Sequence, residues 1–153
     1  MNEPTTPPTR DETLRLMDAG WAGFHDRVSS TPSEQLELHI GDGWTRKQML
    51  AHIATWHDLT VDRLARFAGS GEPSELAEGE DAINARAGRA AEGRTSGEIV
   101  LAMADSFRRL RREVSTLSDA QLAAHQGWAA SIIDGNSYGH YAEHLPDLEA
   151  RRR

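Results

Sequence analysis

Apolar residues recur at intervals of three and four in four long segments of the chain. These stripes consist of Leu14, Met17, Trp21, Phe24 and Val28 in the first segment, Met49, Ile53, Trp56, Thr60, Leu64 and Phe67 in the second, Ile99, Met103, Phe107, Leu110, Val114 and Leu117 in the third, and Tyr138, Tyr141, Leu145 and Leu148 in the fourth. Such spacing places the apolar side chains on one face of an α-helix. No segment shows the alternation of a β-strand, so the pattern predicts an all-α protein.

Capping signals and breaks divide the chain into four long helices. Capping boxes predict three helix starts and are formed by Thr9 with Glu12, Thr45 with Gln48 and Thr95 with Glu98. The fourth helix is expected to begin after a turn at residues 134–136, and Pro146 is expected to kink or restart it. The sequence therefore predicts a four-helix bundle.

The connection between the second and third helices is long. Residues 72–94 are polar and rich in glycine, alanine and acidic residues, with one short helix expected at 81–86. We expect one domain over residues 1–153, with a flexible segment at residues 1–8 and with the arginines of residues 151–153 complementing the dipole of the last helix.

Two glycines interrupt the first helix. Gly20 and Gly23 each cost up to about 1 kcal/mol relative to alanine in a helix interior. We therefore expect another element to pack closely against the backbone at both positions.

Composition narrows the classes of partner. Lys and Arg number 17 and Asp and Glu number 24, which gives a net charge of −7 and argues against nucleic acid as a partner. No segment resembles a signal peptide or a membrane span, so a cytoplasmic protein without a membrane partner is expected. A homodimer and a monomer both fit this composition, with a slight preference for the dimer.

Histidines supply the chemistry, because the chain has no cysteine and so no thiolate ligand. His140 and His144 are four residues apart, or about 400° around a helix, so their side chains project from nearly the same face. Such a pair can chelate one metal ion, but a stable site needs a third ligand, for which His52 is the candidate. From spacing alone His52 and His57 both lie at the edges of their stripe, where an ordinary boundary histidine is the commoner explanation.

These residues resemble the motifs of the DinB-like superfamily, which includes the N-terminal domain of mycothiol-dependent maleylpyruvate isomerases. The similar motifs are Trp44-Thr-x-Lys-x-x-Leu50-Ala-His52-x-x-x-Trp56, Asn84 in the crossover, and His140-Tyr-x-x-His144. The resemblance implies a bundle that binds one divalent metal, zinc or nickel, through His52, His140 and His144. The isomerases carry a second domain for which this chain has no room, so it resembles a single-domain member whose reaction is open.

A site with three histidines leaves a coordination position free for chemistry on a small-molecule substrate. The first hypothesis is a metal-dependent enzyme that delivers a low-molecular-weight thiol such as mycothiol to an electrophile, with Asn84 and Arg86 in the polar crossover binding the thiol. The alternatives are a hydrolase that uses metal-activated water and a non-catalytic binding or resistance protein. Asp58, Asp134 and Glu143 are the candidate partners for the outer ring nitrogens of the ligands.

Overall fold

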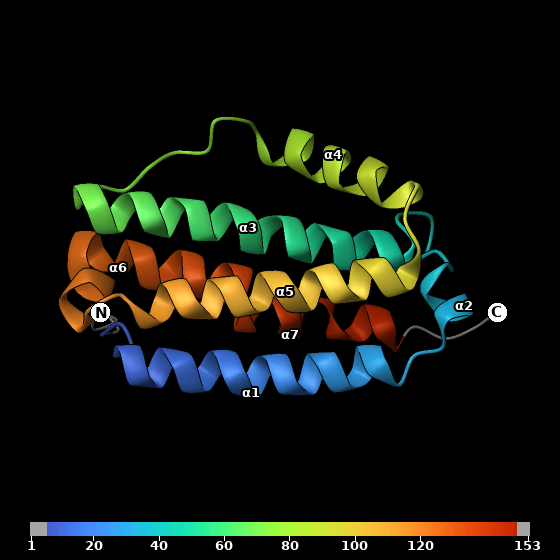
Figure 1. The fold of residues 1–153 in the computed structure, drawn as a ribbon, viewed down its shortest axis with the longest axis horizontal. Coiled ribbons are helices and arrows are strands. Elements are labelled where there is room, and N and C mark those ends of the chain that lie inside the picture. The colour runs from blue at the N-terminus through green and yellow to red at the C-terminus, as the bar shows by residue number, and fades with distance from the viewer. Residues whose placement is uncertain (1–5, 150–153) are drawn as a thin grey trace, which may run out of the picture.

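The computed structural model describes residues 6–149, which form seven helices (Figure 1). They are α1 (Arg10–Ser29), α2 (Ser33–Leu36), α3 (Arg46–Ser70), α4 (Glu80–Glu92), α5 (Ser96–Ser115), α6 (Asp119–Asn136) and α7 (Tyr138–Leu148). Residues 6–149 contain no strand, only an isolated bridge between His39 and Thr45. Residues 1–5 of the segment expected to be flexible, and the arginines of residues 151–153, lie outside the described part of the chain.

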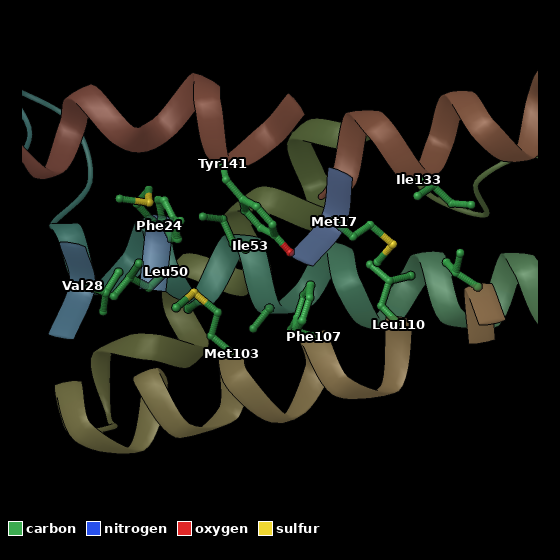
Figure 2. Close-up of a cluster of buried hydrophobic side chains, with 14 of the residues drawn as sticks. Met17, Phe24, Val28, Leu50, Ile53, Met103, Phe107, Leu110, Ile133 and Tyr141 are labelled. Atoms are coloured by element: carbon green, nitrogen blue, oxygen red, sulfur yellow. The ribbon is translucent and has the colours of Figure 1, made fainter. Parts of the chain in front are cut away.

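Four long rods make up the bundle, as the hydrophobic pattern predicted. The rods are α1, α3, α5, and α6 together with α7, while α4 lies on the outside of α3 (Figure 1). Every predicted stripe residue of α3 and α5 is buried, and side chains of all four rods meet in the core (Figure 2). The prediction of a four-helix bundle with a long crossover between its second and third long helices is confirmed.

Threonine caps start three of the rods where the sequence placed them. The hydroxyl oxygens of Thr9, Thr45 and Thr95 accept hydrogen bonds from backbone N–H groups three residues later, at 3.1–3.2 Å. Of the three predicted capping boxes, only that of Thr45 and Gln48 is complete, while Thr9 and Thr95 act as N-caps alone. Another complete capping box, formed by Ser118 and Gln121, starts α6 and was not predicted.

The last rod differs from its prediction. Residues 134–136 do not form a turn but complete α6, and the break falls at Ser137, where φ is −134° and ψ is −108°. An earlier break comes at 124–127, where His125, Gln126 and Gly127 all have positive φ. Ile133 is fully buried, and Nδ2 of Asn136 donates to the carbonyl oxygen of Ile132 at 2.9 Å. Residues 134–136 are therefore helical despite their low helix propensity. Helix α7 continues through Pro146 to Leu148, so the proline does not restart it.

A glycine allows close packing of α1 against α7. A Cβ atom added to Gly20 would lie 2.9 Å from Cβ of Tyr138, so the prediction of a close approach is confirmed there. It is wrong for Gly23, where a Cβ atom would meet nothing within 4 Å.

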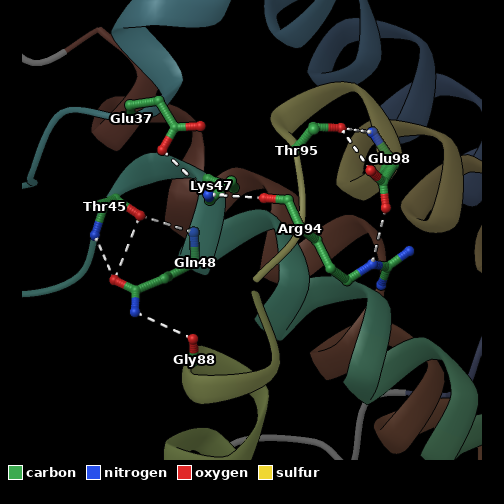
Figure 3. Close-up of polar contacts among 8 residues, drawn as sticks. All are labelled: Glu37, Thr45, Lys47, Gln48, Gly88, Arg94, Thr95 and Glu98. Carbon is green, nitrogen blue, oxygen red and sulfur yellow. Dashed lines mark hydrogen bonds and ion pairs between the residues drawn. The ribbon is translucent and has the colours of Figure 1, made fainter. Parts of the chain in front are cut away.

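Helix α4 is longer than the helix expected at 81–86, and polar contacts fix its position (Figure 3). Nε2 of Gln48 donates to the carbonyl oxygen of Gly88 at 3.1 Å, and Nζ of Lys47 donates to the carbonyl oxygen of Arg94 at 2.8 Å. A Cβ atom on Gly88 would lie 3.1 Å from Nε1 of Trp44. These contacts hold α4 in a register that turns Asn84 toward α3. None of the helices described combines the length and the apolar character needed to cross a membrane.

Candidate metal centre

Three histidine side chains from two helices converge at one point. Nε2 of His140 lies 2.9 Å from Nε2 of His52 and 3.1 Å from Nε2 of His144. The three ligand atoms all lie within 4.8 Å of one another and could hold one metal ion. We refer to His52, His140 and His144 as the histidine cluster. The sequence predicted this set, and the structure brings its members together.

Asn84 determines which nitrogen of His52 carries the proton. Nε1 of Trp56 donates a hydrogen bond to Oδ1 of Asn84 at 2.7 Å, and an indole N–H can only donate, so this atom is the amide oxygen. Nδ1 of His52 lies 2.9 Å from the same oxygen and must therefore donate to it. Nε2 of neutral His52 is left with its lone pair facing the cluster.

Asp147 does the same for His144. Its carboxylate oxygen accepts from Nδ1 of His144 at 2.9 Å, which leaves the lone pair on Nε2. The remaining imidazole, His140, can donate from Nε2 to one of its two neighbours at most, while its Nδ1 is buried without a hydrogen-bond partner in residues 6–149. In either tautomer of His140, at least one of its contacts with the other two rings therefore has no proton to share, an arrangement that a cation would stabilise. Three imidazoles, two of which have oxygen acceptors on their outer nitrogens, fit a divalent transition metal.

Burial keeps His52 and His140 in the neutral state that metal ligation requires. Burial, aided by the charge of His144, lowers the pKa of His52 to about 4. Burial also lowers the pKa of His140 to about 3, with the other cluster histidines acting in the same direction. Both imidazoles are therefore neutral at pH 7 and can donate their lone pairs to an ion.

A cavity of about 600 Å³ opens beside the histidine cluster, and all three histidines line it. We refer to it as the histidine cavity. Apolar side chains form part of its wall, namely those of Trp44, Trp56, Leu76 and Ile132. Its polar lining comes from Arg63, Glu80, Asn84, Ser131, Asn136 and Glu143. The volume is that of a site for a small organic molecule.

The two predicted thiol-binding residues have different positions. Asn84 lines the histidine cavity, and its amide oxygen is already shared by His52 and Trp56. Arg86 is not part of the lining and instead binds Glu78, with 2.6 Å between Nη1 and Oε2.

The acids expected to hold the outer ring nitrogens are the wrong ones. Asp58 pairs with Arg109 at 2.7 Å, Asp134 lies against the backbone of Gly139, and Glu143 lines the cavity. The observed partners are Asn84 and Asp147. A signal for Asp147 was present in the sequence, since it lies three residues after His144 and so on the same face of the helix.

His57 is not the boundary residue that its spacing indicated. It is 0 % exposed, because α5 and α7 both cover this edge of α3. The hydroxyl of Ser106 donates to the carbonyl oxygen of Met103, so it accepts from Nδ1 of His57 at 2.8 Å. Nε2 of His57 then accepts from the hydroxyl of Tyr141 at 2.6 Å. Its two ring nitrogens are thus both used inside the core.

Solved structures with the same fold include proteins of several kinds. The colibactin self-resistance protein ClbS, solved in complex with double-stranded DNA, superposes with a TM-score of 0.79 at 12% identity over 95% of this chain and 96% of that chain. An uncharacterised protein from Escherichia coli UTI89 gives 0.79 at 16% identity over 94% of this chain and 92% of that chain. A mycothiol-dependent maleylpyruvate isomerase gives 0.76 at 20% identity over 94% of this chain but only 62% of its own length. A search of curated protein sequences found no match.

The exclusion of nucleic acid from the net charge is wrong. ClbS has this fold and was solved bound to double-stranded DNA, so the fold accommodates such a partner. The charge argument fails because a net charge of −7 describes the whole chain, whereas a nucleic acid meets only one local surface.

Family membership follows from a match along almost the whole sequence. The family model described as the DinB superfamily matches residues 3–147, which include all three members of the histidine cluster. A metal-dependent enzyme and a resistance protein both fit this family and its structural neighbours. The chain belongs to the DinB superfamily.

Proposed function

We propose that this chain is a divalent-metal-dependent enzyme for small molecules, and specifically a transferase that joins a low-molecular-weight thiol to an electrophilic substrate. One observation carries the proposal: three imidazole nitrogens converge in the wall of a cavity of about 600 Å³. An ion held by three histidines keeps at least one coordination position for a ligand from the cavity. Zinc and nickel both suit imidazole ligands.

The ion would supply one chemical effect, which is to lower the pKa of a thiol or water that binds to it. Asn84 and Asp147 orient the rings of His52 and His144 for binding. Glu80 and Glu143 are the carboxylates in the cavity lining, so the proton that a thiol loses on binding has an acceptor nearby. The apolar wall reduces the access of water that would compete for the substrate.

A thiol is preferred over water as the nucleophile for two reasons. The chain has no cysteine, so a covalent thiol intermediate on the protein is excluded. A thiolate is much the better nucleophile toward carbon at neutral pH. The neighbouring mycothiol-dependent isomerase supports the same choice, and Asn84 is the cavity residue expected to contact the thiol.

A resistance protein that binds and holds a small molecule is the second candidate. The neighbour ClbS is a self-resistance protein and matches this chain over 96% of its own length, in contrast to the longer isomerase. The histidine cavity is large enough for a ligand of drug size. The hydrolase remains a further alternative that uses the same ion.

Mass spectrometry of reaction mixtures tests these alternatives. The protein is stripped with a chelator, reloaded with zinc or nickel, and incubated with a panel of electrophiles with and without mycothiol. The proposal expects a thioether product that requires both the metal and the thiol, and expects no product with the His52→Ala variant. Equal conversion to a water adduct without thiol would refute the transferase and favour the hydrolase. Stoichiometric protection of an electrophile without product would favour the resistance protein.

A further inference from the structure

The histidine cavity extends well beyond the histidine cluster. His52 and Arg63 both line it and are eleven residues apart on α3 (63 − 52 = 11). Eleven residues turn an α-helix by about 1100°, or three turns and about 20°, so the two side chains share one face about 16 Å apart along the axis. A ligand at the histidines therefore has room to extend along α3 toward Arg63.

Arg63 is a positioned cation that forms no ion pair with any residue in the described range 6–149. Its Nη2 donates to the carbonyl oxygen of Ser74 at 2.9 Å, and its guanidinium carbon lies 5.2 Å from the ring centroid of Trp128. Its Nε is buried and unpaired, and no carboxylate within residues 6–149 forms an ion pair with it. Burial, followed by the charge of Arg66, lowers the pKa of Arg63. By contrast, Arg109 and Arg111 on α5 each pair with an aspartate.

We infer that the Arg63 end of the histidine cavity is a subsite for a carboxylate group, carried by a ligand whose other end reaches the histidine cluster. A guanidinium fork matches a carboxylate through two parallel hydrogen bonds. Trp128 covers a face of the guanidinium and Ser74 takes one N–H, which fixes the fork while leaving donors on its edge. The two carboxylates in the lining, Glu80 and Glu143, are both exposed, and neither is paired with Arg63.

The geometry also sets the shape of the ligand. The contacts of Arg63 lie toward the C-terminal end of α3, because Ser74 follows that helix and Trp128 also packs against Phe67. The rise of the helix separates the two ends of the cavity by about 16 Å along the axis. The ligand is therefore elongated, with its metal-binding atom and its carboxylate at opposite ends. This inference deepens the proposed thiol-dependent function, because the elongated ligand is the thiol or its adduct.

Matched thiols of increasing length test the subsite in the cobalt(II)-loaded protein. Each ω-mercaptocarboxylate is compared with the ω-mercaptoalcohol of the same length, and cobalt absorption reports thiolate binding without any turnover. The inference expects the acid to bind about tenfold more tightly than the alcohol once the chain spans the cavity, but not for the shortest pair. Arg63→Gln should abolish this preference and Arg63→Lys should restore part of it. The control Arg66→Gln, at an exposed position one turn from Arg63, should leave the preference for the acid unchanged.

A second set of probes separates this inference from the proposed function. Fatty acids and fatty alcohols of matched length have no thiol, and fluorescence of Trp44, Trp56 and Trp128 reports their binding. Tighter binding of the fatty acid than of the fatty alcohol, lost in Arg63→Gln, would support the subsite. If at the same time no thiol changed the cobalt spectrum, only the proposed thiol function would be refuted. Equal affinity for acid and alcohol in both sets, or a preference that survives Arg63→Gln, would overturn the inference.

Discussion

The folded chain should lose stability as the pH falls below 6.5, and His57 should account for a defined share of the loss. Burial lowers the pKa of His57 to about 3, from an ordinary value of 6.5 that applies to the unfolded chain. Between these values the unfolded state binds a proton that the folded state does not. The stabilisation is therefore fully present above pH 6.5 and is lost as the pH falls toward 3. For one such histidine, the loss between pH 7 and pH 5 is about 2 kcal/mol.

Urea unfolding followed by circular dichroism measures this effect at pH 7, 6 and 5, with a chelator present so that metal binding does not contribute. His57→Gln removes the titrating group but keeps a polar side chain between Ser106 and Tyr141. The variant should be less stable at pH 7 because it loses well-formed buried hydrogen bonds. Its further loss between pH 7 and pH 5 should be about 2 kcal/mol smaller than that of the unchanged protein. His39→Gln, at an exposed position, is the control. If His57→Gln and the unchanged protein lose equal free energy over this range, His57 is not held neutral in the core.

Three further predictions follow from the metal centre and the packing. His52→Ala, as an example of replacing one histidine of the cluster, should lose most of its metal content as measured by elemental analysis. Its helical circular dichroism should persist, because the hydrophobic rods form the core. Full metal occupancy in the variant would show that His52 is not part of the site. Asn84→Ala should lower metal affinity by about 10- to 100-fold in a competition titration, because the ring of His52 loses its oriented acceptor, and an unchanged affinity would contradict that role. In thermal unfolding, Gly23→Ala should stabilise the protein by up to about 1 kcal/mol, whereas Gly20→Ala should destabilise it through the contact with Tyr138. Equal changes in stability for the two variants would contradict the packing described.

Much of the bundle could be predicted because its signals are local. The stripes of α3 and α5 follow from helical periodicity, and every residue predicted there is buried. His140 and His144 could be paired for the same reason, since one helix holds both. The third histidine of the cluster, His52, lies 88 residues from His140, and only the family resemblance distinguished it from a boundary histidine.

The features that were missed depend on tertiary contacts. His57 and His52 look alike from their spacing, yet His57 is enclosed because two other helices cover its side of α3. Asn84 reaches His52 because Gln48 holds α4 one turn further along, at Gly88. The break at 124–127 gives His125 a left-handed backbone conformation, which is unusual for a residue other than glycine and has no strong sequence signal.

The distance in sequence between the two sides of the histidine cluster has a practical consequence. A metal bound there would act as a cross-link between His52 and His140, closing a loop of 88 residues in the folded chain only. By mass action, an ion at a free concentration 100 times its dissociation constant would stabilise the folded state by about 2.7 kcal/mol. The melting temperature would therefore rank metal ions, and the affinity of each ion could be read from a thermal shift without any substrate being known.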